Sequence, residues 1–391
     1  MSLDSSRRSP VLRFRDSLGK KYPDWIQYFL GDCVKFSKGR GISKEEIVDD
    51  GKLKCIRYGE LYTHYGEVIS SVVSATNVCA STLVFSKQND VIIPASGETA
   101  LDIVSASCVL LDNVALGGDI NIIRSEQNGV FLAYCLNQKR KDISRFAQGI
   151  SVIHLYATGL RRLQLSLPCI EEQQKIADFL SSVDTRIEQL EKKKSLLEQY
   201  KKGLMQKLFS KEIRFKDDEG EEYPEWEISK LGKHTTTRNG ESNREDSYEV
   251  GEYAFFDRSQ DIRASTKYIF DGEAIIVAGE GKEFLPKYYV GKFDLHQRSY
   301  AIMNFQGVSA MFVFYSLTHN RNYFPSVAVG STMKSLRLPM FIEMPIRLPY
   351  YREQNKIANI LSSVDNKIEL VAEHITHTRM FKKGLLQQMF V

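Results

Sequence analysis

A long duplicated segment constrains this chain of 391 residues more than any other feature. The stretch from Leu167 to Phe209 recurs from Leu348 to Phe390 without a gap, and about half of the aligned positions are identical. The two copies lie much farther apart than the about 20–50-residue period of a solenoid. The sequence therefore predicts two copies of one structural unit rather than an array of short repeats.

A second repeat lies upstream of each copy. Arg13-Phe14 matches Arg214-Phe215, and Trp25 matches Trp226. These are the two tryptophans of the chain. Between these markers the two halves share little, so we expect one scaffold that is adapted to two different ligands. The expected parts are an N-terminal tail (1–21), a first variable domain (22–166), a central helix (167–210), a linker with a second variable domain (211–348) and a C-terminal helix (349–391).

Both duplicated segments have the pattern of long amphipathic helices. Apolar residues recur at steps of four and three, which is the heptad seam of a coiled coil, and Lys194 and Lys201 are charged gaps in it. Pro168 and Pro349 stand where a helix can begin. The seam residues are Ile176, Leu180, Val183, Ile187, Leu190, Leu197, Ile357, Leu361, Val364, Ile368, Val371 and Ile375.

Each helix could pack only on its own domain, or the two helices could pair with each other. Two seams of matching length favour an antiparallel pair related by a two-fold axis. A helix of ~35 residues is roughly 50 Å long, whereas one turn of B-DNA is about 34 Å. Such a pair could set a fixed distance between two sites on one face of a duplex.

The variable domains contain short apolar runs between turn signals. Val91–Pro94, Ile120–Ile123, Ala274–Val277 and Tyr300–Met303 are typical of strands, whereas residues 130–136 and 310–317 are typical of buried helices. The expected fold class is α+β. It comprises two globular domains of mixed structure, separated by two long helices that form an antiparallel coiled coil, with a pseudo-two-fold internal repeat.

Composition excludes several classes of protein. A hydrophobic content of 42% and a charged content of 26% are those of a globular chain. No apolar run approaches the roughly 20 residues that a membrane span requires, so we expect a cytoplasmic protein. The six cysteines form no C-x-x-C pair, and no metal site is expected. A net charge of +4 is compatible with DNA binding but does not argue for it.

Basic and polar residues gather in the expected loops of both variable domains. Arginine and lysine neutralise phosphates, and arginine or asparagine can bind base edges through two hydrogen bonds. Any one of these residues could instead be a solvated surface charge. The duplicated architecture is what supports a role of the group as a whole in DNA binding. The candidates for DNA binding are Lys38, Arg40, Lys44, Arg57, Tyr58, Lys139, Arg140, Lys141, Arg145, Arg238, Asn239, Arg244, Arg258, Arg263, Lys267, Lys282, Ser331, Thr332 and Lys334.

An enzymatic reading has weak support. The chain has no G-x-x-x-x-G-K-S/T loop for ATP and no Asn- or Asp-Pro-Pro-aromatic motif of an amine methyltransferase. Asp271, Glu280 and Lys282 have the spacing of a nuclease metal site, in which carboxylates hold Mg²⁺ beside a lysine. The corresponding stretch of the first domain lacks the lysine, so a DNA-contacting or turn loop is the better interpretation, and no catalytic residue is expected.

The duplicated Leu-Pro…Glu-Gln-x-Lys-Ile-Ala…Leu-Ser-Ser-Val-Asp…Ile-Glu segment resembles the paired conserved regions of the specificity (S) subunits of type I restriction–modification enzymes. The resemblance covers nearly the whole chain. Residues 42–63 and 272–298 are each similar to a common type of target-recognition domain. The resemblance implies a non-catalytic subunit in which each variable domain reads a few base pairs in the major groove of double-stranded DNA.

The resemblance also implies partners. Two methylation (M) subunits would dock on the conserved helices, and restriction (R) subunits would then join. S-adenosylmethionine, ATP and Mg²⁺ are expected in those partners, and no cofactor is expected in this chain. Docking is expected near the helix ends, although the same residues could be shared because they cap and pack the helices. They are Pro168, Glu172, Gln173, Pro349, Glu353 and Gln354.

Two other hypotheses remain open at this point. A pure coiled-coil interaction scaffold would explain the heptads but not the basic loops or the divergent middles. Binding to DNA that weakens with salt would distinguish a DNA reader from such a scaffold. A complex that only methylates DNA, without a restriction partner, is equally compatible with the sequence.

Overall fold

The computed structural model describes residues 9–391, except for residues 100 and 151. The first eight residues of the expected tail lie outside the described part. By its contacts the chain divides into two compact units: unit 1 comprises residues 1–190 and 374–391, and unit 2 comprises residues 191–373. A search of the described helices found none with the length and apolarity that a membrane crossing requires.

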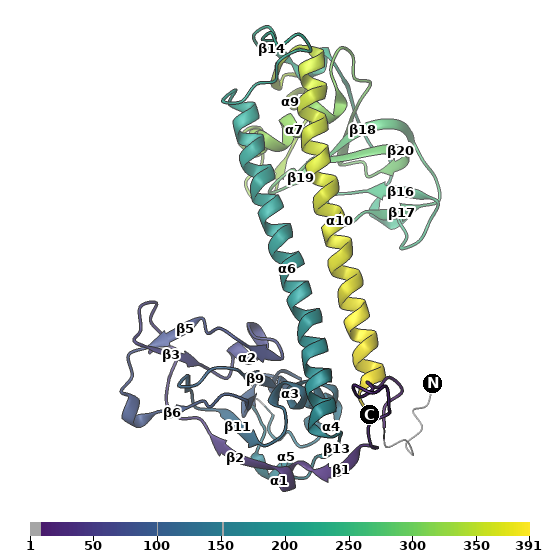
Figure 1. The fold of residues 1–391 in the computed structure, drawn as a ribbon. Coiled ribbons are helices and arrows are strands. Elements are labelled where there is room, and N and C mark those ends of the chain that lie inside the picture. Colours follow the sequence, from purple (N-terminus) through teal and green to yellow (C-terminus); the bar gives the residue numbers. More distant parts are fainter. Residues whose placement is uncertain (1–8, 100, 151) are drawn as a thin grey trace. The chain divides into compact units, whose positions relative to one another are not determined.

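Two long helices confirm the prediction from the duplicated segment. Helix α6 spans Ile170–Phe209 and helix α10 spans Tyr351–Met389, so each begins two residues after its proline and not with it (Figure 1). The first half of α6 and the last part of α10 belong to unit 1, and the remaining halves belong to unit 2. Each unit therefore contains one antiparallel section of the helix pair.

Most of the seam residues are buried, whereas Ile187, Leu197 and Ile368 are half-buried. The two packing alternatives, on the helix's own domain and on the other helix, are compatible. In unit 1, Ile176, Leu180 and Val183 share one core with residues of the globular domain and with Leu385 and Met389 of α10. Unit 2 has the same arrangement, in which Ile357 and Leu361 pack with Met205 and Leu208 of α6. Each helix thus packs on its own domain and on the other helix at once.

Unit 1 contains two sheets of moderate size. The five-stranded sheet has the order β2 (Val34–Lys38), β11 (Ile120–Ser125), β7 (Asp90–Pro94), β9 (Ser107–Val109), β4 (Val68–Ile69). The four-stranded sheet has the order β5 (Ser74–Thr76), β3 (Leu53–Ile56), β10 (Ala115–Leu116), β6 (Val84–Phe85). Two pairs complete the unit, β1 (Ile26–Phe29) with β13 (Gln164–Leu167) and β8 (Ser96–Gly97) with β12 (Ile153–His154). Its short helices are α1 (Leu30–Cys33), α2 (Glu60–Thr63), α3 (Gly129–Gln138), α4 (Arg140–Ser144) and α5 (Ala157–Leu160).

Unit 2 is built on one larger sheet. The order is β15 (Thr236–Asn239), β21 (Ser299–Met303), β18 (Phe270–Ala278), β20 (Lys287–Leu295), β16 (Tyr253–Phe256), β17 (Arg263–Ser265). Two pairs flank it, β14 (Glu227–Lys230) with β23 (Pro345–Leu348) and β19 (Glu280–Gly281) with β22 (Lys334–Ser335). Its helices are α7 (Ala310–His319), α8 (Tyr323–Val327) and α9 (Leu338–Ile342). The four strand segments and two helices expected from sequence are all present, which confirms the α+β class.

The two domains repeat at their ends and in the strand order of their central sheets. Ile26 pairs with Leu167 in unit 1, and Glu227 pairs with Leu348 at the equivalent place in unit 2. Trp25 packs against Phe131 and Phe390, and Trp226 packs in the same way against Phe312 and Phe209. The central sheets share one order of five strands, β2-β11-β7-β9-β4 in unit 1 and β15-β21-β18-β20-β16 in unit 2, and the last pair is parallel in both. Unit 2 adds β17 to this sheet and unit 1 has a separate four-stranded sheet, so the sequences diverge on a shared scaffold.

Candidate DNA interface

A buried ion pair anchors the start of each long helix. The guanidinium of Arg13 donates to both carboxylate oxygens of Glu172, at 3.0 and 2.6 Å. Arg214 donates to Glu353 in the same way, at 3.2 and 2.9 Å. Both glutamates are 0% exposed. Residues 9–21, expected as a tail, therefore pack on unit 1, and their counterparts after α6 do so in unit 2.

A buried glutamine then joins each helix to its globular domain. Gln173 accepts a hydrogen bond from the backbone N–H of Asn128, which caps α3, and donates to the carbonyl of Pro168. Gln354 makes the same two contacts with Ser309 and Pro349. These side chains make contacts within the chain, in agreement with the alternative that the residues are repeated because they cap and pack the helices. Contact with a partner subunit would have to be made by exposed residues beside them.

Part of the basic set in unit 1 is brought together by backbone contacts. The N–H of Gly39 donates to Ile120 at 2.9 Å, the N–H of Arg40 donates to Leu116 at 2.9 Å, and Gly117 donates to Ile56 beside Arg57. The loops that carry Lys38, Arg40 and Arg57 therefore meet at one end of β3 and β10. Lys44 is exposed in the segment that follows, and Tyr58 is half-buried beside Arg57.

The other basic candidates of unit 1 form a separate group. Lys139 follows α3, Arg140 and Lys141 lie on α4, and Arg145 follows α4. Arg145 forms an exposed ion pair with Asp142 at 3.2 Å, which weakens its availability for a phosphate. Lys38 of the first group is likewise paired, with Asp119 at 3.1 Å, so what distinguishes the first group is the backbone contacts that bring its members together.

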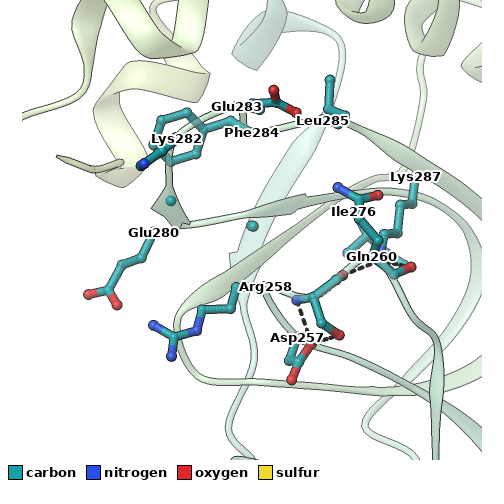
Figure 2. Close-up of a pocket in the computed structure, with 13 residues that line it drawn as sticks. Asp257, Arg258, Gln260, Ile276, Glu280, Lys282, Glu283, Phe284, Leu285 and Lys287 are labelled. Atoms are coloured by element: carbon teal, nitrogen blue, oxygen red, sulfur yellow. Dashed lines mark hydrogen bonds between the residues drawn. The ribbon is translucent and has the colours of Figure 1, made fainter. Parts of the chain in front are cut away.

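In unit 2 the structure gathers several candidates around one pocket. Arg258 and Lys282 line it together with Asp257, Gln260, Glu280 and Lys287. Figure 2 shows the charged ends of Arg258, Glu280 and Lys282 on the same side of the pocket. Lys334 pairs in β22 with Gly281 of β19, which places the loop of Ser331 and Thr332 beside Lys282.

The loop that presents Arg258 is held from beneath by buried polar groups. The ammonium of Lys287 donates to the carbonyls of Ser259 and Gln260 at 2.6 and 3.0 Å. Burial lowers the pKa of Lys287, although Asp257 and Asp261 oppose the shift. The carboxylate of Asp257 accepts from the N–H and hydroxyl of Ser259. A loop fixed in this way can hold an arginine toward a phosphate with little loss of entropy on binding.

Other candidates of unit 2 are placed elsewhere. Arg238 lies on β15, where its guanidinium stands 5.3 Å from the centre of the Phe270 ring. Arg263 belongs to β17, and Lys267 follows that strand. Asn239 ends β15, where its side chain donates to the carbonyl of Gly240, and Arg244 lies 3.8 Å from Asp257 behind the pocket.

Sequence reasoning missed two exposed hydrophobic side chains in unit 1. A bridge between Gln148 and His154 closes the loop at residues 149–153, and a bridge between Val329 and Ser335 closes residues 330–334 in unit 2. Gly149 and Gly330 have φ of 124° and 122°, and a Cβ on either would meet a loop carbonyl at 2.0 or 2.2 Å. The two loops are therefore equivalent, and the exposed residues of the described part of the first are Ile150 (100%) and Val152 (50%).

The tips of these equivalent loops differ in chemistry. Unit 1 presents Ile150 and Val152, whereas unit 2 presents Ser331, Thr332 and Met333. Residue 151 lies outside the described part. Apolar side chains contact the methyl group of thymine in a major groove, and hydroxyls hydrogen-bond to base edges. The recurring pair of loop glycines, 181 residues apart like the helices, is the sequence signal that could have identified Ile150 and Val152.

The structure separates the residues of the possible nuclease site. Asp271 lies near the start of β18, where it pairs with Lys292, and Glu280 follows the far end of the same strand. Seven residues of strand span roughly 23 Å, too far for two carboxylates to share one ion. Among the described residues, no group of three His, Cys, Asp or Glu could hold a metal ion. The nuclease alternative is therefore wrong.

Comparison with known proteins places the chain in a family. Residues 22–199 and 223–377 match the family model described as type I restriction modification DNA specificity domain. The MjaVIII type I restriction enzyme specificity subunit of Methanocaldococcus jannaschii is 24% identical, over 95% of this chain and 94% of that protein. The putative MjaX specificity subunit of the same organism is 27% identical, over 69% of this chain and 70% of that protein.

Solved structures share the fold. The crystal structure of a type I restriction–modification S subunit from M. genitalium superposes with a TM-score of 0.69, covering 98% of this chain and 99% of that one at 16% identity. A chain from a study of complex assembly and conformational transition of the type I system gives a TM-score of 0.54 at 14% identity, covering 95% and 98%. Because the family model matches most of the chain on two anchored copies of one scaffold, this protein belongs to the DNA specificity subunits of type I restriction–modification enzymes, which are non-catalytic.

Proposed function

We propose that this chain reads a bipartite, asymmetric target in double-stranded DNA, with one half-site for each globular domain. The observation that carries the proposal is the pair of equivalent loops with different tips, Ile150 and Val152 in one domain and Ser331 to Met333 in the other. A shared scaffold that presents different side chains at the same place is suited to reading two different sequences. Because the loops differ, the half-sites are expected to differ.

Phosphate contacts would fix the position of each domain, and loop side chains would give the specificity. In the first domain Lys38, Arg40 and Arg57 are the proposed phosphate contacts, and in the second they are Arg258, Lys282 and Lys334. The helix pair α6 and α10 would set the spacer between the half-sites. Two methylation subunits and further restriction subunits would dock on exposed surface near the helix ends, in the cytoplasm, and would bring their own cofactors.

The test is sequencing of modified adenines in DNA from cells that express this chain with its methylation subunit. The proposal expects one motif with two unlike half-sites and an invariant gap, which disappears when this chain is omitted. A matched control expresses the methylation subunit with an unrelated specificity subunit. Modification that is unchanged without this chain, or a motif with a single continuous site, would refute the proposal.

A further inference from the structure

Three side chains from three elements meet in unit 1, and we call them the first clamp. The hydroxyl of Tyr134, on α3 of the globular domain, donates to Asp184 of α6. The ammonium of Lys382, on α10, lies 2.6 Å from the other oxygen of Asp184 and 5.3 Å from the centre of the Tyr134 ring. Glu67 adds a second carboxylate 3.0 Å from Lys382. One lysine thus connects the second helix to both the first helix and the domain.

Unit 2 contains a second clamp with the same chemistry. The hydroxyl of Tyr315, on α7, donates to Asp365 of α10 at 2.7 Å. The ammonium of Lys201, on α6, lies 2.5 Å from Asp365 and 5.4 Å from the centre of the Tyr315 ring. Each residue stands 181 positions from its counterpart in the first clamp, as 134 to 315, 184 to 365 and 201 to 382 show. The two helices exchange roles between the clamps.

These groups are largely removed from water. The side chains of Lys382 and Lys201 are 16% and 22% exposed. Burial lowers the pKa of Lys382, but Glu67 and Asp184 outweigh that effect and raise it. Burial raises the pKa of Tyr134 and of Tyr315, and the neighbouring aspartates raise both further. Lys382 therefore stays charged and the two phenols stay protonated, which is the state in which their clamp contacts form.

Both clamps select the same register of the helix pair. Asp184 of α6 pairs with Lys382 of α10, and Lys201 of α6 pairs with Asp365 of α10. The two α6 residues are separated by the same number of positions as the two α10 residues, so one antiparallel alignment satisfies both pairs. The apolar seam alone repeats every seven residues, so a slide by one heptad would again match apolar positions. Lys201 and Lys382 interrupt that seam and pair with an aspartate of the other helix, whereas Lys194 interrupts it but pairs within its own helix. A polar seam residue fixes register at some cost in stability.

We propose that the two clamps are the positioning residues that determine the spacer length of the DNA target. This inference rests on the proposed function and adds to it the groups that set the gap. A slide of one heptad moves one helix by ~10.5 Å along the other, which corresponds to about three base pairs at ~3.4 Å each. Because the tyrosines tie each domain to the clamped aspartate, a change of register carries the domain with the helix.

The test uses the full chain in its complex with the methylation subunit. Lys201→Met with Asp365→Asn neutralises the second clamp without leaving a buried charge unpaired, and the amide can still accept from Tyr315. Lys382→Met with Asp184→Asn and Glu67→Gln treats the first clamp in the same way, because Glu67 would otherwise lose the partner of its charge. Lys201→Arg is the conservative variant. Lys194→Met is the matched control, since the Lys194 ammonium pairs with Glu198 on its own helix at 2.9 Å.

The first measurement is adenine modification on a library in which fixed half-sites flank spacers of every length within three base pairs of the preferred one. The neutralised clamps are expected to raise modification of other spacers about tenfold, a loss of ~1.4 kcal/mol of discrimination, with unchanged half-sites. The Lys194→Met and Lys201→Arg variants should keep one spacer. If a neutralised clamp also keeps a single spacer, the inference is wrong.

A second measurement does not depend on DNA. Spin labels introduced through unnatural amino acids at the exposed Leu196 and Leu370, both in unit 2, report the register of the helices directly. The distance distribution should be single in the parent and in Lys194→Met, and should gain further components when the second clamp is neutralised. A distribution that stays single overturns the clamp as the register device. A parent complex without a bipartite motif would instead refute the proposed function, and the distances would still decide on the clamp.

Discussion

The guanidinium of Arg298 donates from Nη1 to both carboxylate oxygens of Glu280, at 2.8 and 3.0 Å. Arg298 was not among the residues expected to bind DNA, yet its side chain is 62% exposed. Glu280 belongs to the wall of the pocket that also presents Arg258 and Lys282. In the absence of DNA, the Arg298 guanidinium at the proposed interface is therefore paired with the Glu280 carboxylate.

Replacing Glu280 by glutamine is expected to strengthen DNA binding. Removal of the carboxylate frees Arg298 for a phosphate, and one additional phosphate contact steepens the dependence of log K on log salt by about 0.9. The measurement is the affinity of the assembled complex for its target between low and moderate salt. Glu343→Gln is the matched control, because it releases Lys230 in the same unit without touching the pocket. An unchanged salt slope for Glu280→Gln would remove Arg298 from the interface.

Exchange of the loop tips should change one half-site at a time. Ile150→Ser with Val152→Met gives the first domain the tip chemistry of the second, on a loop whose closing bridge and left-handed glycine are retained. Sequencing of modified adenines should then show a different first half-site, with the second half-site and the gap preserved. Ser331→Ile with Met333→Val is the reciprocal variant and should alter the second half-site. A motif that stays the same in both variants would show that these loops do not contact bases.

Loss of Arg13 is expected to destabilise the chain strongly. Glu172 is 0% exposed, and its carboxylate would remain buried without its partner, at a cost of about 3–5 kcal/mol. Thermal and urea unfolding of the full chain measure the effect in Arg13→Ala. The double variant Arg13→Met with Glu172→Gln should recover most of the loss, because no charge is then stranded. Arg15→Ala serves as the control, and equal stability of Arg13→Ala and Arg15→Ala would contradict the prediction.

The acid dependence of stability should include a contribution from Asp257. Burial raises its pKa, but hydrogen bonds from Ser259 and the nearby Arg244 outweigh burial, and the net shift is downward. A carboxylate with a lowered pKa in the folded state stabilises above the unfolded pKa of about 3.9, and this contribution is lost as the pH falls through the folded value. Asp257→Asn should therefore lower Tm at pH 7 and progressively less toward pH 3.

The control for that titration is Asp271→Asn, at an exposed position near the start of β18. This variant measures what an exposed Asp-to-Asn change does to Tm by itself at each pH. If the effect of Asp257→Asn does not vary with pH beyond that of the control, the hydrogen bonds from Ser259 do not favour the ionised carboxylate. The loop of Arg258 would then lack the support assigned to it.

The sequence by itself determined the repeat, both long helices and the family. Heptad spacing at Ile176, Leu180 and their copies needs no tertiary information, because a helix buries one side of itself wherever it packs. Strands such as Val91–Pro94 and the buried helix at residues 310–317 could also be predicted, since each is an apolar run bounded by turn signals. The absence of catalytic motifs pointed correctly to a non-catalytic subunit.

Tertiary structure alone decided how the polar residues are used. Lys201 looked like a defect in the seam, and only its contacts with Asp365 and Tyr315 show why a charge stands there. For Glu172 and Gln173 the sequence left partner docking and helix packing both open, and the structure shows buried contacts with Arg13 and with the cap of α3. Burial and partner choice depend on residues 45 or more positions away, and a periodic pattern carries no information about them.

The same reason explains the loops. Asp271 and Glu280 are close in sequence but lie toward opposite ends of one extended strand, so sequence spacing suggested a site that the backbone forbids. Nothing in the local sequence singled out Ile150 and Val152, and only the β-bridge between Gln148 and His154 shows that they lie at an exposed loop tip. Local sequence fixes periodicity and composition, whereas the pairing of distant strands decides which side chains reach the solvent and a ligand.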